Sequence, residues 1–558
     1  MNLKYFKKLS GFAIPLILIL ASLAFSYLRV IDNYELQSLD LRFKLRTAPP
    51  TSDKIVIIEI GEDSIEKLGR FPFDRNYHAI LIKALSESGA RMILFDFLFS
   101  EPQEHDKELE FALNQAGNVY LPFAFDIDKT KGYKIISVRK YLAKCLENFT
   151  REAKGTGHIN AIPDPDGKFR RIPVFINYEE TFYPSISFLM GCDYLGVNLK
   201  DVNRAAGKYI SCGLREKIPL DEDSNMIINF SGKWGASYKH YSYIDILQSY
   251  FAGVSGQKPN MDFAGFKDKI CIVGLTAAGT SDAHPNPFES LYPGMGLHVE
   301  LINSMINKNY ISRVSRAANL AILIMLSILV SLGTLKTKPI RGLFVLLLEI
   351  FFFAGAAVFL FDFFGIWIDM VCPILLMAIL YLSSTLYKYI AEWKNRLVFE
   401  NELGIAKKIQ ESFLPKEELE IEDVDIAVIM YTARQVGGDL YDFIDFGNRK
   451  FGVMIGDVSG KGIPASLFMA MTVGSFRSLV KLHSRPKDVL FNLNAKLIEE
   501  SSSNLFVTMF YAIFNLEDKT VVFSNGGHLP VAHVNRDGEV NFLDVSEGMP
   551  LGLEESDY

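Results

Sequence analysis

Four apolar runs divide the chain into segments of different hydropathy. They are Phe12 to Val30, Ala317 to Leu335, Leu343 to Phe361 and Ile366 to Tyr387. Each run approaches or exceeds the roughly 20 residues that a helix needs to cross a bilayer. The pattern predicts four membrane spans, the last three clustered, with mixed polar regions before and after the cluster.

The region between the first two runs combines two kinds of hydrophobic pattern. Short β-rich runs predict buried strands at "KIVIIEIG", "RMILFDFLFS" and "KICIVGL". An amphipathic helix that ends at Gly89 is predicted over "ILIKALSESGA". Strand, helix and strand in this order are typical of a βαβ unit. We therefore expect an α/β domain with a partly parallel sheet within residues 32–316.

Basic residues beside the apolar runs predict the orientation of the chain. Three lysines precede the first run, and "KTKPIR" joins the second run to the third. Because basic flanks favour the cytoplasmic side, residues 32–316 are expected outside and everything after Lys388 inside. The letters "SLA" at 22–24 also fit a cleaved signal peptide, but the long apolar run favours an uncleaved anchor over residues 1–31.

Composition narrows the choice of partners. The chain has 558 residues, too many for one core, and 49% of them are hydrophobic, as expected when part of the chain lies in lipid. The net charge of -7, without a basic stripe interleaved with aromatic residues, argues against nucleic acid as a partner. The five cysteines lack CxxC spacing, so ordinary buried thiols are a simpler interpretation than a zinc site or a dense disulfide framework.

Two acids interrupt the membrane runs. Glu349 lies within the third run, and Asp369 lies near one end of the fourth. An acid inside a span is a functional candidate. For Glu349 a helix–helix contact is favoured over transport, which stays as an alternative.

A helical pattern continues out of the fourth run. The sequence "YIAEWKNRLVFENELGIAKKIQESF" starts at Tyr389, and Leu414 and Pro415 end it. Its apolar positions are spaced helically, but Glu400 and Gly404 interrupt a strict heptad. Two interpretations remain open: a short signalling helix that forms a homodimer, and a helix that packs within one subunit.

Two aspartates, each directly after a glycine, mark the ends of a predicted hairpin. "DLYDFIDF" and "KFGVMIGD" pair if the chain turns at residues 447–449. That register sets Asp439 opposite Asp457, with Cβ atoms about 5 Å apart. Carboxylates that close repel each other, so either one is protonated or a hard cation such as Mg²⁺ or Mn²⁺ lies with them. Solvated polarity at a hairpin end is the alternative.

The segment after this hairpin offers a second motif. "GDVSGKG" is similar to a phosphate-binding loop, but too few residues separate its glycines, and Gly462 follows Lys461 where Ser or Thr is needed. This excludes a phosphate loop of that type. Pro464 instead predicts the start of an apolar helix, "PASLFMAMTVGSF".

Three blocks of the exported region are similar to a known family. They are "IVIIEIGEDSIEKLGRFPFDRNYHAILIKALSESGARMILFDFLFSEP", "GHINAIPDPDGKFRRIPV" and "IVGLTAAGTSDAHPNPFESLYPGMGLHVELINSMI". Together with the clustered spans they resemble the CHASE type 2 extracellular sensory domain, although Gly61 and Phe71 depart from its usual residues. The resemblance supplies no ligand. Asp282 and His284 are interpreted as loop residues, and "DPDG" at 164–167 as a turn, not as metal or calcium sites.

Six ordered blocks follow the last span. They are "AKKIQESFLP", "ARQVGGDLYDF", "IGDVSGKGIPASLFMA", "FVTMFYAIFN", "FSNGGHLP" and "GMPLG". They resemble the PPM-type (protein phosphatase 2C-like) serine/threonine phosphatases of the SpoIIE branch. The resemblance implies a binuclear Mn²⁺ or Mg²⁺ centre held in part by Asp439, Asp457 and the carbonyl of Val458, and water that attacks phosphoserine or phosphothreonine directly. Arg434 lies where related enzymes keep a phosphate-binding arginine, with surface solvation as the alternative.

Two further residues of these motifs, Lys461 and His528, are interpreted as loop and core positions without a chemical role. The family's pattern continues past "PLGL" into strands that carry "GD" and "TDG", which supply further metal-binding acid. The sequence stops at Tyr558. We therefore expect a C-terminally incomplete phosphatase domain that binds metal weakly and is itself inactive.

Together these observations predict a multidomain, multi-pass protein of the cell (inner) membrane. It would be a signal-transducing, metal-dependent serine/threonine protein phosphatase, acting on a phosphorylated regulatory protein, by resemblance a STAS-type anti-sigma factor antagonist. Its partners would further include membrane lipid and an unknown extracytoplasmic ligand. The alternative is a non-catalytic receptor whose phosphatase-like domain only binds a partner. The expected parts are an anchor (1–31), an α/β sensor (32–316), three further spans (317–387), a coupling helix (388–415) and an α+β phosphatase domain (416–558).

Overall fold

The fold is described from a computed structural model, in which the chain forms two compact units, Met1–Tyr387 and Lys388–Tyr558. The predicted first span, Phe12 to Val30, lies outside the described residues except for Leu20. The structure describes residues 20, 31–127, 136–138, 141–205, 209–212, 216–279, 282–335, 337–416, 419–432, 435–500, 504–543 and 548–558.

A seven-stranded sheet forms the centre of the N-terminal unit. The strand order is β14-β1-β15-β2-β3-β5, and β6 also pairs with β3. Neighbouring strands are parallel except for β3 and β5, which confirms the prediction of a partly parallel sheet. The strands are β1 (Ile55–Ile60), β2 (Met92–Phe95), β3 (Val119–Phe125), β5 (Tyr141–Lys144), β6 (Gly155–His158), β14 (Lys239–Ser242) and β15 (Ile270–Leu275).

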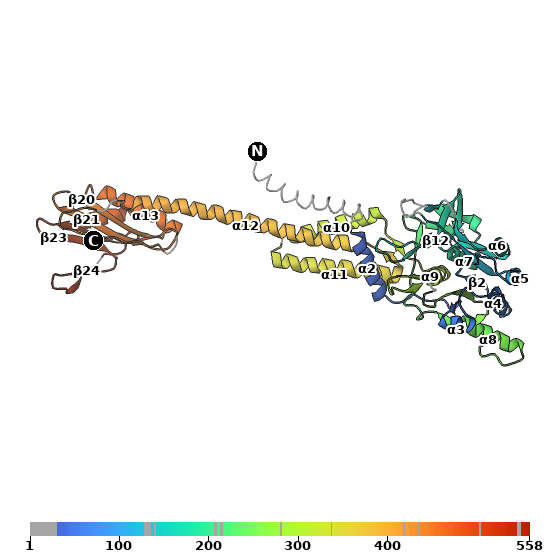
Figure 1. The fold of residues 1–558 in the computed structure, drawn as a ribbon. Coiled ribbons are helices and arrows are strands. Elements are labelled where there is room, and N and C mark those ends of the chain that lie inside the picture. Colours follow the sequence, from blue (N-terminus) through green and yellow to red (C-terminus); the bar gives the residue numbers. More distant parts are fainter. Residues whose placement is uncertain are drawn as a thin grey trace. The chain divides into compact units, whose positions relative to one another are not determined.

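Helices cover both faces of this sheet (Figure 1). One face packs against α4, α5 and α8, and the other against α7 and α9. The helix predicted to end at Gly89 ends two residues earlier, and Gly89 follows with a φ of 80°. The helices of this unit before Arg316 are α2 (Asp32–Leu45), α3 (Glu62–Leu68), α4 (Arg75–Glu87), α5 (Asp106–Ala116), α6 (Glu147–Glu152), α7 (Ile186–Leu195), α8 (Tyr243–Val254) and α9 (Gly294–Ile306).

One predicted strand is shorter than its hydrophobic run. Only Met92–Phe95 of "RMILFDFLFS" forms a strand, because the chain leaves the sheet there, and Phe97 and Phe99 turn into the core beside Phe95. Short strands and two 3-10 turns complete the part of the unit before Tyr310. They are β4 (Ile136–Val138), β7 (Arg171–Pro173), β8 (Phe175–Tyr178), β9 (Thr181–Pro184), β10 (Val202–Ala205), β11 (Tyr209–Cys212), β12 (Glu216–Pro219), β13 (Asn225–Ile227), β16 (Ala283–His284), β17 (Tyr292–Pro293), η1 (Leu199–Asp201) and η2 (Phe263–Phe266).

Three helices of the described chain are long and apolar enough to cross a membrane: α10 (Arg316–Leu335), α11 (Pro339–Phe364) and α12 (Val371–Phe413). Their buried leucines pack into one cluster within the N-terminal unit. The fourth apolar run was expected to be helical from Ile366, and this is wrong. Its first residues form β19 (Ile366–Trp367), which pairs with β18 (Ser312–Arg313), so the helix begins only at Val371.

The C-terminal unit contains a four-stranded antiparallel sheet in the order β20-β21-β22-β23. Helices α13 and α14 pack on one face of it and share a buried core with its strands. The proline-initiated helix is confirmed, since α13 starts one residue before Pro464. The elements are β20 (Asp439–Asp445), β21 (Lys450–Val458), α13 (Ile463–Leu479), α14 (Pro486–Glu500), β22 (Val507–Asn515), β23 (Thr520–Gly526), β24 (Val531–Val534) and β25 (Val540–Leu543).

Candidate functional site

The predicted hairpin forms with the predicted register. Strands β20 and β21 pair antiparallel, and Asp439 lies opposite Asp457. The turn at residues 447–449 has three successive positive φ angles, of 70°, 51° and 51°. Because side chains alternate between the faces of a strand, both carboxylates lie on one face, at the end of the hairpin away from the turn.

The two carboxylates form an acidic pair that faces solvent. Partial burial, together with the hydrogen bond to Asp439 and its charge, raises the pKa of Asp457. Within the described part of the chain, the basic side chain that pairs with an acid of β20 is that of Arg477. Its partner is Asp442, on the opposite face of the strand. A carboxylate pair of this kind is stabilised by a shared proton or by a cation from solution.

Glycines allow the backbone to approach this pair closely. A Cβ atom on Gly438 would lie 2.7 Å from the carbonyl oxygen of Val458 and 3.3 Å from Asp457 Oδ1. The Val458 amide donates to the carbonyl oxygen of Gly438 at 3.3 Å. A Cβ atom on Gly456 would lie 2.6 Å from the carbonyl oxygen of Thr508. Side chains at positions 438 and 456 would therefore force these strands apart.

The three oxygen donors, Asp439, Asp457 and the Val458 carbonyl, are the type that a hard divalent cation prefers. The described residues contain no group of three or more His, Cys, Asp or Glu side chains that could hold a metal ion. The donor chemistry fits Mn²⁺ or Mg²⁺, and the described residues supply only part of a coordination shell. Arg434, the predicted phosphate-binding residue, lies outside the described residues.

His528, interpreted from the sequence as a core position, lies beside this pair. Thr508, the cross-strand neighbour of Asp457, lies 2.9 Å from His528 Nδ1 through its hydroxyl oxygen. The side chain of Asn525 holds the backbone of His528 at both its amide and its carbonyl. Burial lowers the pKa of His528, and the charge of Asp439 acts in the opposite direction. In the sequence, the two glycines directly before His528 were the available sign that it lies near the site. Lys461 is exposed before α13.

One of the two sensor motifs, at residues 164–167, forms a turn, as the sequence predicted. In "DPDG" the Gly167 amide donates to the Asp164 carbonyl oxygen at 2.8 Å. Its acids bind the fully buried Arg170, a network that the sequence analysis missed. The prediction of a loop at His284 is wrong, because His284 ends the short strand β16, which pairs with β17. Its Nε2 lies 3.1 Å from Asp282 Oδ2.

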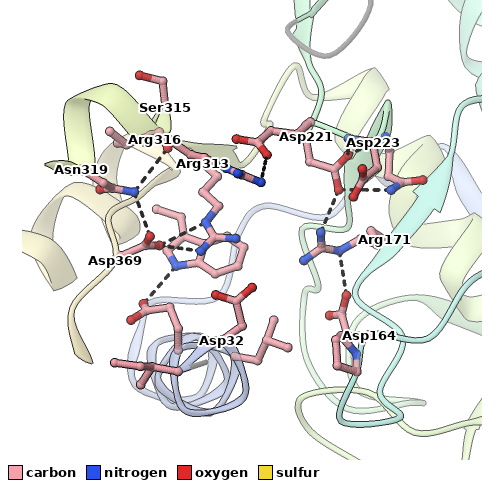
Figure 2. Close-up of a pocket in the computed structure, with 18 of the residues that line it drawn as sticks. Asp32, Asp164, Arg171, Asp221, Asp223, Arg313, Ser315, Arg316, Asn319 and Asp369 are labelled. Atoms are coloured by element: carbon pink, nitrogen blue, oxygen red, sulfur yellow. Dashed lines mark hydrogen bonds and ion pairs between the residues drawn. The ribbon is translucent and has the colours of Figure 1, made fainter. Parts of the chain in front are cut away.

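A cavity of about 760 Å³ lies within the N-terminal unit, at the starts of α2, α10 and α12. Figure 2 shows Arg171 between Asp164 and Asp221 on one side of it. On the other side Arg313 and Asn319 both bond to Asp369. The charged groups of this cavity wall thus bind one another across segments that are distant in the sequence.

Next to this cavity, α2 holds the first turn of α12. One carboxylate oxygen of Glu35 accepts the backbone amides of Met370 and Val371, both at 2.9 Å. The other oxygen accepts Arg42 at 2.6 Å and the Trp367 indole at 3.3 Å. A carboxylate at a helix N-terminus satisfies free amides and suits the helix dipole. Within the N-terminal unit, the first turn of α12 is therefore bonded directly to α2.

Comparison with protein families gives two matches. The CHASE2 domain model matches residues 14–334, which is more than half of the chain. The model for Stage II sporulation protein E (SpoIIE) matches residues 447–558. The second match includes Asp457 and begins after Asp439.

Curated relatives match part of the chain. Phosphoserine phosphatase RsbU of Bacillus subtilis is 31% identical over 159 residues, which cover 28% of this chain and 47% of that protein. Phosphoserine phosphatase RsbP of the same organism is 24% identical over 162 residues, with 28% and 40% covered. The chain thus spans less than half of the length of these relatives.

Among solved structures, the SiaA-PP2C domain of Pseudomonas aeruginosa is 14% identical, with 28% of this chain and 64% of that chain covered and a TM-score of 0.25. The structure of the PP2C phosphatase domain of SpoIIE from Bacillus subtilis, with a fragment of its regulatory domain, is 24% identical, with 22% and 36% covered and a TM-score of 0.20. The chain belongs to the CHASE2 domain family, and it joins this sensor domain, through helices apolar enough to span a membrane, to a SpoIIE-like, PPM-type phosphatase domain.

Proposed function

We propose that this protein is a membrane-bound, sensor-controlled phosphatase that hydrolyses phosphoserine or phosphothreonine on a regulatory protein in a metal-dependent reaction. The observation that carries the proposal is the facing pair Asp439 and Asp457 beside the Val458 carbonyl. The match to phosphoserine phosphatases supports the same reaction.

The residues of the site have different roles in this reaction. Asp439, Asp457 and the Val458 carbonyl would hold one side of the metal centre. When bound, Mn²⁺ or Mg²⁺ lowers the pKa of water so that it can attack phosphorus at neutral pH. Gly438 and Gly456 keep side chains away from the strand end, and Arg434 would orient the phosphate of the substrate.

The proposed substrate is the phosphorylated form of a STAS-type anti-sigma factor antagonist. One solved structure similar to this chain contains the RsbU and RsbW domains of one protein, at 21% identity and a TM-score of 0.20. In the proposed topology four spans cross the cell membrane, with the CHASE2 domain outside and the phosphatase domain in the cytoplasm, as the basic flanks favour.

The test measures phosphate release by the purified protein with its complete cytoplasmic domain, in lipid nanodiscs, from a phosphoserine-bearing STAS-domain protein. Release should require Mn²⁺ or Mg²⁺ and stop with a chelator. Release that continues in the chelator would exclude metal-dependent hydrolysis. Tight binding of the phosphoprotein without any turnover would instead support a non-catalytic receptor.

A further inference from the structure

The side chain of Gln410, in the last turn of α12, lies in the C-terminal unit against the segment that leads to Asp439. Its Nε2 donates to the carbonyl oxygen of Gly437 at 2.8 Å, and its Oε1 accepts the Gly437 amide at 3.1 Å. The side chain of Gln410 thus pairs both backbone polar groups of Gly437, as a neighbouring strand would pair them. Gln410 is only 5% exposed, although most of its neighbours in the helix face solvent.

This contact lies two residues before Asp439. Gly437 and Gly438 have no side chains that could fix the backbone, and glycine loses the most conformational freedom on folding. On the far side the Val458 amide holds the carbonyl of Gly438. The segment is therefore fixed from two directions, by Gln410 at Gly437 and by Val458 at Gly438.

We propose that Gln410 is a positioning residue, whose amide fixes Gly437 and so holds Asp439 opposite Asp457 in the arrangement that binds a divalent cation. The inference rests on the proposed function for the identity of the site. It deepens that function because Gln410 belongs to α12, so the position of α12 against the phosphatase domain sets the metal affinity. A rotation of α12 would withdraw the amide and leave Gly437 unrestrained.

The contact is separable from simple helix packing. Methionine has nearly the same length and volume as glutamine but forms neither hydrogen bond. Gln410→Met therefore keeps the buried side chain and removes only the polar contact. Lys408, exposed in the same turn, provides the matched control Lys408→Ala.

The experiment measures the dissociation constant for Mn²⁺ by titration calorimetry on the protein with its complete cytoplasmic domain in nanodiscs, which needs no turnover. We expect Gln410→Met to raise it roughly 10-fold, the range seen when a group that orients metal ligands is lost. Turnover at saturating Mn²⁺ should stay within about twofold, since the acids themselves are unchanged. Lys408→Ala should change neither quantity.

A lower unfolding temperature with an unchanged dissociation constant would reduce Gln410 to a structural contact and overturn the inference. A wild-type chain that binds no Mn²⁺ would overturn it as well. Binding without hydrolysis would defeat the proposed function alone.

Hydrogen exchange provides a second measurement that does not depend on the folding of the variant. Because coupling between two sites is reciprocal, Mn²⁺ bound to the wild-type protein should strengthen the contact with Gln410. Exchange of the Gly437 amide should therefore slow at least several-fold when Mn²⁺ is added. An unchanged exchange rate in metal-loaded protein would overturn the inference.

Discussion

Aspartates gather in both units, but their surroundings differ. In the sensor domain Asp40, Asp164 and Asp166 surround the buried Arg170 at 2.6 to 2.9 Å. In the phosphatase domain Asp439 and Asp457 face each other at a solvent-exposed strand end. The sensor cluster contains its own cation, so its contribution is to structure. The phosphatase pair would take its cation from solution, so its contribution is to binding.

The largest expected effect is on the sensor cluster. Arg170→Met would remove the buried cation that the three acids share, and Lys168 and Arg171 would compensate only part of the lost charge. The free energy of unfolding should therefore fall by about 3 kcal/mol. Hydrogen exchange in β1 and β15 would report the loss. Arg151→Met, at an exposed arginine of α6, serves as control. A loss below about 1 kcal/mol would mean that the cluster does not hold the sensor domain together.

Substitution in the acidic pair should weaken metal binding without lowering stability. Asp457→Asn removes a ligand and should weaken Mn²⁺ binding and lower activity by at least about 100-fold, more than loss of an outer partner. Without metal the variant should unfold at the same or a higher temperature, because it no longer has two acids at close range. Asp445→Asn, at the other end of β20, should leave Mn²⁺ binding intact. Unchanged metal affinity in Asp457→Asn would contradict the site.

A third variant tests the two kinds of aspartate within one strand. Asp442 is 2% exposed and receives two hydrogen bonds from Arg477, at 2.7 and 3.0 Å. Arg477→Met should cost about 1–3 kcal/mol of stability by leaving this carboxylate unpaired. Mn²⁺ affinity should not change. Adding Asp442→Leu should recover part of the loss, and a simple sum of the two single effects would show that the residues do not interact.

The smallest effect is expected at an exposed ion pair of the sensor domain. His105 Nδ1 lies 2.9 Å from Asp74 Oδ2, and this hydrogen bond raises the pKa of His105. A raised pKa in the folded state gives stability that is complete below the usual value of about 6.5 and is lost as pH rises through the raised value. At pH 5.5 the wild-type protein should unfold at a temperature higher than that of His105→Gln by under about 2 °C. The difference should vanish by pH 9; an equal difference at both pH values would exclude the pair as its cause.

Local features of the fold could be predicted from the sequence. The register of the hairpin follows from the alternation of its strands and from the turn at residues 447–449, so the Asp439–Asp457 pair was predictable. Pro464 predicted the start of α13, and the strand and helix patterns predicted the α/β sheet. Each of these depends on neighbouring residues.

Contacts between distant segments could not be predicted. Arg170 and Asp40 are 130 positions apart, and no periodicity connects them. Gln410 bonds to backbone atoms, which every residue has, so the sequence carries no sign of its partner. The start of α12 was misplaced because pairing of Ile366 and Trp367 with β18 outweighs their apolar, helix-compatible pattern.

The carboxylate of Glu35 on the first turn of α12 bears on how such proteins can be recombined. A chimera that exchanges the sensor at a boundary after α2, or that grafts α12 onto another receptor, would separate the acid from the two amides it caps. Residues 32–45 and 366–371 should therefore be transferred together in a chimera, although more than 300 residues separate them. Domain exchange that keeps both segments together should keep the first turn of α12 capped, and exchange that separates them should leave its two amides without Glu35.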